Sequence, residues 1–415
     1  QDEERITTKK LFQMTPEERK EILQDLAANV KKLNLEWLKM MGKSEGQLRE
    51  KMSLFWHGHF AVRVRGFAQV ESYVNTIRKY ALTDFGTLLM AVSKEPAMLR
   101  FLNNVQNRKN SPNENFAREV MELFTLGRGN YTEHDIKEAA RAFTGWGISD
   151  EDTFELKKNQ HDFGEKTIFG KTGNWEGEDV IKMILENRQT SRFITEKIYA
   201  FFVNRKLNKS RIEELSTFFY NSGYNIPELM RKIFSSDWFY DKENIASEIK
   251  SPVELIVGLN RTFGISYDNT KPLLALQRVL GQTLFFPPNV SGWAGGRNWI
   301  DNSTLVTRMN LPGILARSGG FDLQAKAMDD EAPNESPEEK STNNFHCSFN
   351  WELFIKNFEG IPEDQLWESL CGYLLGALHI PPIPENLGVT TVMTREDRII
   401  KMSLHLSQLP EFQLS

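Results

Sequence analysis

The sequence has few cysteines and histidines and no long hydrophobic run. Its 415 residues include 2 Cys and 7 His. Cys347 and Cys371 are too few for a cysteine-rich zinc module, and in an oxidising compartment the pair allows either one disulfide or two free thiols. No apolar run approaches the roughly 18 residues that a membrane span needs, so we expect no transmembrane segment.

An excess of positive charge is also missing. The formal net charge is −5, with 26% charged and 40% hydrophobic residues. This balance is ordinary for a globular protein and argues against nucleic acid as a partner, because nucleic-acid binding needs a basic surface. The sequence has no Gly-x-Ser-x-Gly nucleophile motif, no phosphate-binding glycine loop, no His-Glu-x-x-His and no complete calcium loop. Function has to be argued from clusters of polar residues instead.

Most of the chain has the pattern of α-helices. A helix over 15–41 begins with an N-cap and a first-turn proline, and apolar residues then recur every three or four positions. Residues 210–213 and 251–254 both match the Ser-x-x-Glu capping box. Residues 153–170 alternate around a polar turn and predict a β-hairpin. The predicted fold class is mainly α, a large multi-helix body with a small β-hairpin insertion near residues 153–170.

Composition predicts three parts. Residues 1–325 form the main helical body, which carries the hairpin. Residues 326–345 are acidic, contain proline and have almost no large apolar residues, which indicates a flexible linker or loop. Residues 346–415 are predicted to form C-terminal helices that pack on the body.

The helix predicted from about residue 114 to residue 126 carries the densest set of charges. At about 100° per residue, its polar residues fall within roughly 140° of arc, opposite an apolar face. The polar set is Glu114, Asn115, Arg118, Glu119 and Glu122. One interpretation is a solvated face with i,i+4 ion pairs. The other is a carboxylate array that lines a cleft and binds a metal or acts as acid and base.

A second charged helix follows at once and favours the functional interpretation. Residues 132–135 resemble a capping box, and Glu138 and Arg141 lie on the following turns. We expect the two helices to face their charges toward one another.

The histidines offer candidate ligands. His57 and His59 lie in the stretch SLFWHGHFAVRV, residues 53–64, among aromatic residues that favour simple packing. In a helix the two rings diverge by about 200°, so only one can be the ligand, and we predict His59. His161 lies at the turn of the predicted hairpin, where it is either part of the turn or a ligand brought to the helices.

A loop rich in proline, glycine and tryptophan covers residues 285–299. Trp293 and Trp299 flank a Gly-Gly-Arg segment that includes Arg297. These residues either stack on a sugar or anchor the loop to the body.

Several long motifs resemble the bacterial family called domain of unknown function 1800. They are LREKMSLFWHGHF, the stretch from PAMLRFLNN to AARAFTGW, HDFGEKTIFG, FPPNVSGWAGGRNWI and LSQLPEFQLS. The resemblance runs from about residue 10 to the end. It implies a large, mostly helical, usually exported protein, often encoded beside a second exported family, but it implies no activity. Its motifs include His59, Glu114, Arg118, Glu119, Glu122, Glu138, Arg141, His161 and Trp293, whereas many members differ at His57.

These observations lead to one main hypothesis. We expect a periplasmic or secreted chain whose leader has been removed, acting as a hydrolase on a glycan or another envelope polymer. Catalytic groups would be Glu119, Glu122, Arg118 and Arg141. A divalent metal would be held by His59, His161, Glu114 and Glu138. The substrate would contact Trp293, Arg297 and Trp299.

Two alternatives stay open. The charged motifs would instead be a buried structural network in a non-enzymatic assembly or glycan-binding protein, with a co-encoded exported protein as a partner. Histidine and carboxylate ligands between helices also suit an iron- or manganese-dependent oxidoreductase.

Overall fold

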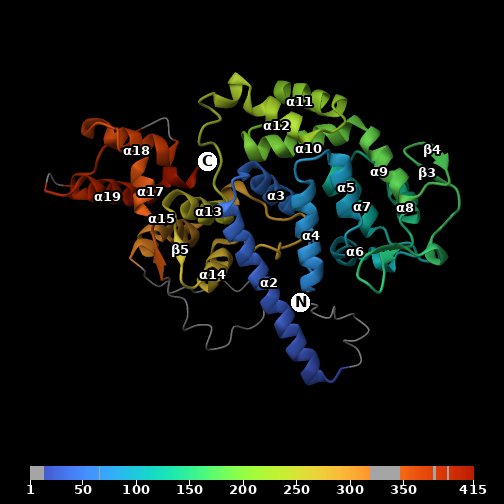
Figure 1. Ribbon diagram of the computed structural model, residues 1–415. Helices are drawn as coiled ribbons and strands as arrows, with labels where there is room; N and C mark the ends of the chain where they lie inside the picture. Colours follow the sequence, from blue (N-terminus) through green and yellow to red (C-terminus); the bar gives the residue numbers. More distant parts are fainter. Residues whose placement is uncertain (1–13, 65, 318–345, 377–379, 390–391) are drawn as a thin grey trace. The chain divides into compact units, whose positions relative to one another are not determined.

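The computed structural model describes residues 14–64, 66–317, 346–376, 380–389 and 392–415 (Figure 1). It is mainly helical with small two-stranded antiparallel sheets, which confirms the predicted fold class. Compact packing divides the chain into two units. Unit 1 contains residues 1–34, 46–236 and 285–293, and unit 2 contains residues 35–45, 237–284 and 294–415. The linker predicted at 326–345 lies outside the described residues.

Helices make up most of unit 1. The long helix α2 (Pro16–Lys43) begins in it. The other helices are α3 (Gln47–His59), α4 (Phe67–Tyr80), α5 (Phe85–Ser93), α6 (Pro96–Phe101), α7 (Asn115–Met121), α8 (Glu133–Ala142), α9 (Gly177–Glu186), α10 (Arg188–Phe202), α11 (Lys209–Asn221) and α12 (Ile226–Phe234). Short 3₁₀ turns lie at η1 (Asn104–Gln106) and η3 (Lys158–Gln160), and a π-helical turn, η2 (Glu122–Leu126), extends α7. Figure 1 shows α7, α8, α9 and the β3–β4 hairpin together in this unit.

Aromatic residues at the end of α3 form part of the unit 1 core. Trp56, Phe60, Phe85 and Phe124 are all at most 1% exposed. The Trp56 ring stacks on Phe60 and Phe85 at 5.7 and 5.6 Å between centroids, and Phe60 meets Phe124 edge-on at 5.2 Å. This cluster holds α3 against the turn that ends the Glu-rich helix.

The predicted β-structure near 153–170 is present, but its strands pair differently. Strand β2 (Phe154–Leu156) pairs backward with β1 (Trp146–Ile148), and β3 (Lys166–Ile168) pairs forward with β4 (Lys171–Gly173). The β3–β4 turn is Phe169–Gly170, with φ of +49° and +74°, which suits a tight hairpin. His161 therefore lies in the connection between two hairpins.

Unit 2 is also helical. It contains α13 (Pro252–Phe263), α14 (Lys271–Leu280), α15 (Asn302–Ala316), α17 (Trp351–Lys356), α18 (Leu366–Leu375) and α19 (Arg395–Ser407). Strands β5 (Ser266–Tyr267) and β6 (Cys347–Ser348) pair antiparallel. Short helical turns are η4 (Asp237–Tyr240), η5 (Gly296–Trp299), η6 (Glu363–Gln365), η7 (Glu385–Leu387) and η8 (Pro410–Gln413). Cys347 and Cys371 do not form a disulfide with one another.

The two predicted Ser-x-x-Glu capping boxes had different outcomes. Ser251 and Glu254 form the predicted capping box at the start of α13. At α11 the predicted box is wrong, because Asn208 is the N-cap and accepts a hydrogen bond from the Arg211 amide. Asn is at least as good a cap as Ser, and it lies two residues earlier. Over the described residues, no helix is long and apolar enough to span the bilayer.

Candidate functional site

His59 lies at the end of α3 and caps the π-helical turn η2. Its Nε2 donates to the carbonyl oxygen of Phe124 at 3.0 Å. The nearby Leu126 carbonyl accepts from the side chains of Gln189 and Asn130 at 3.2 and 3.0 Å. Helix ends leave carbonyls without intrahelical partners, and these side chains supply the missing donors.

Burial makes the His59 ring neutral, and the bond to Phe124 sets which ring nitrogen carries the proton. Burial and the nearby Lys197 lower the pKa of His59 well below its usual value, although the Phe124 carbonyl opposes this. The ring is therefore neutral, with its proton on Nε2, and Nδ1 has no hydrogen-bond partner among the described residues. His59 is a buried capping residue with one spare acceptor.

His57 points to a different part of unit 1, as the helical phase predicts. Its Nε2 accepts a hydrogen bond from the Phe285 amide at 3.1 Å, which places the ring proton on Nδ1. The ring also meets Phe285 and Trp293, each at 5.5 Å between centroids. His57 thus holds both ends of the 285–293 segment against the end of α3.

The buried His57 ring makes stability depend on pH. Burial lowers its pKa to about 3, whereas an unfolded histidine titrates near 6.5. The stability that depends on a neutral ring is complete above pH 6.5 and is lost as the pH falls toward 3, at about 1.4 kcal/mol per pH unit. His57→Gln keeps an acceptor and removes this titration, so urea unfolding between pH 7 and 5 should weaken less steeply. Because His59 is also buried with a lowered pKa, part of the dependence of stability on pH should remain in this variant. An exposed control, His134→Gln, should match the wild type; an unchanged slope in His57→Gln would contradict the prediction.

Glu114, Arg118 and Glu133 form an ion-pair ladder across α7 and α8. Arg118 Nη2 lies 3.0 Å from Glu114, and both terminal nitrogens of Arg118 bind the Glu133 carboxylate at 2.7 and 2.8 Å. Hydrogen bonding to Glu133 raises the pKa of Arg118. Side chains of this ladder are one-third to two-thirds exposed, so it is a solvated network with modest stabilising effect. The contacts of Glu114 and Arg118 are those of an exposed ion-pair ladder, and they do not extend to Glu119.

Glu119 and Glu122 lie one turn apart and have opposite environments. Glu122 accepts hydrogen bonds from the Tyr131 hydroxyl and from Arg128 Nε, the latter at 3.0 Å. The Tyr131 hydrogen bond, aided by Arg128, lowers the pKa of Glu122. Glu119 is half-buried and forms no hydrogen bond or ion pair with the described residues. Burial, together with the charge of Glu122, raises its pKa.

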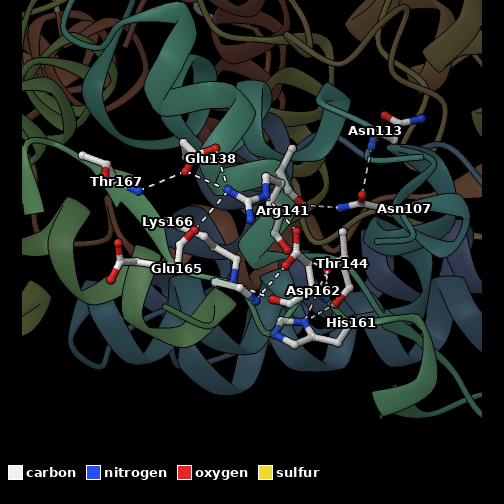
Figure 2. Close-up of polar contacts among 12 residues, drawn as sticks. Asn107, Asn113, Glu138, Arg141, Thr144, His161, Asp162, Glu165, Lys166 and Thr167 are labelled. Carbon is white, nitrogen blue, oxygen red and sulfur yellow. Dashed lines mark hydrogen bonds and ion pairs between the residues drawn. The ribbon is translucent and has the colours of Figure 1, made fainter. Parts of the chain in front are cut away.

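Arg141 is the centre of a second charged network (Figure 2). Its Nη1 donates to both Glu138 oxygens at 2.9 and 3.0 Å, and its Nε donates to Asp162 at 2.7 Å. Nη1 also reaches the carbonyl of Glu165 at 3.2 Å, and Glu138 accepts from the Thr167 amide at 3.0 Å. Arg141 and Glu138 thus face the 161–170 segment, not α7 as we expected.

His161 and Lys166 are tied into the same segment. His161 is 2% exposed, and its Nδ1 donates to the Thr144 carbonyl at 2.6 Å. Lys166 is 1% exposed and donates to the carbonyls of Asp162 and Gly164 at 2.5 and 2.9 Å. Burial lowers the pKa of this lysine. Both side chains satisfy backbone carbonyls that the loop leaves inside the protein.

The structure does not bring the predicted metal ligands together. Within the described ranges, no group of three or more His, Cys, Asp or Glu residues could hold a metal ion. His59 caps η2, His161 binds Thr144, Glu114 pairs with Arg118 and Glu138 pairs with Arg141.

The predicted substrate-binding tryptophans are not exposed platforms. Trp293 is half-buried against His57 in unit 1. In unit 2, Trp299 is 8% exposed, which leaves too little surface for a sugar to stack on, and Arg297 is exposed. For Trp293 and Trp299 the anchoring interpretation is the better one.

Sequence reasoning missed three partners that set the charges of the site. Tyr131 binds Glu122, Glu133 binds Arg118 and Asp162 binds Arg141. The sequence did offer a reason to consider Asp162, because it directly follows His161 in the same motif. No sequence pattern pointed to Tyr131 or Glu133, because they reach α7–η2 only through the turn that follows η2.

The fold and these networks define a mainly helical protein whose charged motifs fix the end of α3, the Glu-rich α7–η2 helix and the hairpin segment in one unit. The chain belongs to the DUF1800 family: the model described as "Protein of unknown function (DUF1800)" matches residues 2–414. This confirms the resemblance found in the motifs. No curated protein and no solved structure matched the chain.

Proposed function

We propose that the protein is a carboxylate-dependent hydrolase in which Glu119 is the general acid and Glu122 the ionised partner. Glu119 carries the proposal, since it forms no ion pair with an arginine among the described residues, and burial and Glu122 raise its pKa although the charge of Arg118 opposes them. Glu122, one turn away, has a lowered pKa. Two neighbouring carboxyl groups with pKa values pushed apart are the arrangement that lets one donate a proton while the other stays charged.

The two groups suit cleavage of a glycosidic bond. A protonated Glu119 would donate to the leaving oxygen, and the charged Glu122 would stabilise the positive charge that develops on the sugar ring. Tyr131 and Arg128 hold Glu122 in its ionised form. Neither carboxyl group is fully buried: Glu119 is half-buried and the side chain of Glu122 is 16% exposed. The substrate class, a glycan or another envelope polymer, rests on the export that the family resemblance implies.

Glu119→Gln tests this proposal. It keeps the shape of the side chain and removes the proton that is transferred, so hydrolysis of envelope glycans should fall about 10²-fold or more. The melting temperature should stay the same or rise, because an amide avoids the charge repulsion from Glu122. Reducing-end release from purified peptidoglycan and other envelope polysaccharides measures the activity.

The matched control is Glu133→Gln, a carboxylate of the same network that is exposed and paired with Arg118. This variant should keep most of its activity. The wild-type rate should also fall at high pH as Glu119 loses its proton, and at low pH as Glu122 gains one. Absence of cleavage across the panel, or full activity in Glu119→Gln, would overturn the hydrolase.

A second function is favoured by the Arg141 network. Its carboxylates are all paired, as expected for a structural element of a non-enzymatic assembly or glycan-binding protein. In that case wild type and Glu119→Gln should bind glycan, or a co-encoded exported protein, equally well and release no reducing ends. Sedimentation with insoluble peptidoglycan distinguishes the two functions.

A further inference from the structure

Arg308 is a fully buried arginine in α15 of unit 2. Its relative exposure is 0%, and it is among the largest completely buried side chains. An arginine stays protonated in proteins, so its charge has to be compensated wherever it is buried. Burial lowers the pKa of Arg308 to about 10, which still leaves it charged at neutral pH, and Glu254 opposes this shift.

Among the described residues, hydrogen-bond partners exist for only one of the three guanidinium nitrogens of Arg308. Nη1 donates to the Lys250 carbonyl at 3.0 Å and lies 3.5 Å from Gln413 Oε1. Nε and Nη2 have no hydrogen-bond partner among the described residues. Glu254 acts on the guanidinium through its charge alone, because its carboxylate forms no hydrogen bond with it. The charge of Arg308 is thus buried with two donors to spare.

The two spare donors lie on one edge of the guanidinium. That edge presents Nε and Nη2 as a fork, which matches two oxygens of a carboxylate or phosphate. Arg78 in unit 1 shows the same fork in use, with Nε and Nη2 at 3.2 and 2.6 Å from the two oxygens of Glu50. Arg308 has the same geometry without such a carboxylate among the described residues.

Gln413 adds another donor beside this fork. It is 3% exposed, and its Nε2 also has no partner among the described residues. Lys250 adds positive charge nearby, with its Nζ donating to the Phe412 carbonyl at 2.7 Å. We propose that Arg308 and Gln413 bind a small oxyanion, a carboxylate or a phosphate-type ion, inside unit 2. This site is independent of the hydrolase proposed for unit 1.

The first experiment measures anion content. The full chain is exchanged extensively into chloride buffer and unfolded, and the filtrate is analysed by ion chromatography for phosphate and sulfate and by mass spectrometry for organic acids. A tightly held ligand should appear at about one equivalent per chain, and its identity separates the phosphate type from the carboxylate type.

The second experiment covers a ligand that exchanges. At constant ionic strength, inorganic phosphate, sulfate or acetate should raise the melting temperature above the value in chloride by about 3 °C at saturation. Arg308→Met should lose this shift. Gln413→Glu should lose the shift too, because the new carboxylate would lie beside the guanidinium and take the place of the anion. This second variant tests the proposal if Arg308→Met does not fold.

The matched control is Arg317→Met, an exposed arginine at the C-terminal end of α15, which should respond like the wild type. The proposal is overturned if no anion is released and no oxyanion shifts the wild-type melting temperature, which would mean that water satisfies these donors. An equal shift in Arg308→Met or Gln413→Glu would overturn it as well, since the anion would then bind elsewhere.

Discussion

Gly292→Ala should lower the free energy of unfolding of unit 1 by about 3 kcal/mol. Gly292 has a φ of +73°, where a side chain strains the backbone, and an added Cβ would lie 2.2 Å from the carbonyl oxygen of Gly58. Both obstacles are backbone, so neither a rotamer change nor a shift of a flexible side chain relieves them. The 285–293 segment has to move away from α3 and give up the hydrogen bond between Phe285 and His57.

Urea unfolding and tryptophan fluorescence measure this effect, because Trp293 should become more exposed as the segment moves. Gly129→Ala is the matched control. Gly129 also has a positive φ, +85°, but an added Cβ meets nothing within 4 Å. Gly129→Ala should therefore lower the free energy of unfolding by only about 1 kcal/mol, which is the cost of placing alanine at a positive φ. Equal costs for the two variants would show that the contact with Gly58 does not constrain the segment.

Arg141→Met should destabilise unit 1 by about 2–3 kcal/mol. The change leaves Glu138 and Asp162 without their shared partner while both remain largely buried, at 14% and 18% side-chain exposure. It also removes the contact with the Glu165 carbonyl that holds the hairpin segment to α8. The measurement is chemical unfolding at pH 7, together with hydrogen exchange of the 161–173 amides, which should speed up.

Arg118→Met is the control for a more solvated network and should cost at most about 1 kcal/mol.

The Arg141 network also predicts that the protein loses stability in acid. Burial raises the pKa values of Glu138 and Asp162, but hydrogen bonds from Arg141 and backbone amides outweigh it and hold both values below the usual range. Their contribution is complete above about pH 4.5 and is lost as the pH falls through the lower folded values. Arg141→Met should flatten this acid slope; an unchanged slope and stability would refute the network.

Local patterns predicted much of the secondary structure. The capping box at Thr132 and Asp135 is present, and Gly127 ends the Glu-rich helix with a φ of +76°. The divergence of His57 and His59 followed from helical phase and is confirmed. These features depend on residues within a few positions of one another, which is the range over which sequence periodicity and capping act.

Long-range partners could not be predicted in the same way. The pairing of β1 with β2 and of β3 with β4 replaced the single expected hairpin, because short alternating stretches do not specify which neighbour they join. Glu119 and Glu122 looked equivalent in the sequence. In the folded chain, Tyr131 and Arg128 lower the pKa of Glu122, whereas Glu119 is half-buried and forms no hydrogen bond or ion pair with the described residues.

By itself, the sequence determined the helical fold class, the family and the charged face of the 114–126 helix, because each is written in local periodicity or in a long contiguous motif. Tertiary structure decided what the histidines do. His59 caps a turn 65 residues further on, and His57 receives the Phe285 amide 228 residues away. Such contacts depend on which buried donors and acceptors the folded chain brings within hydrogen-bond distance, and no pattern of neighbouring residues encodes that.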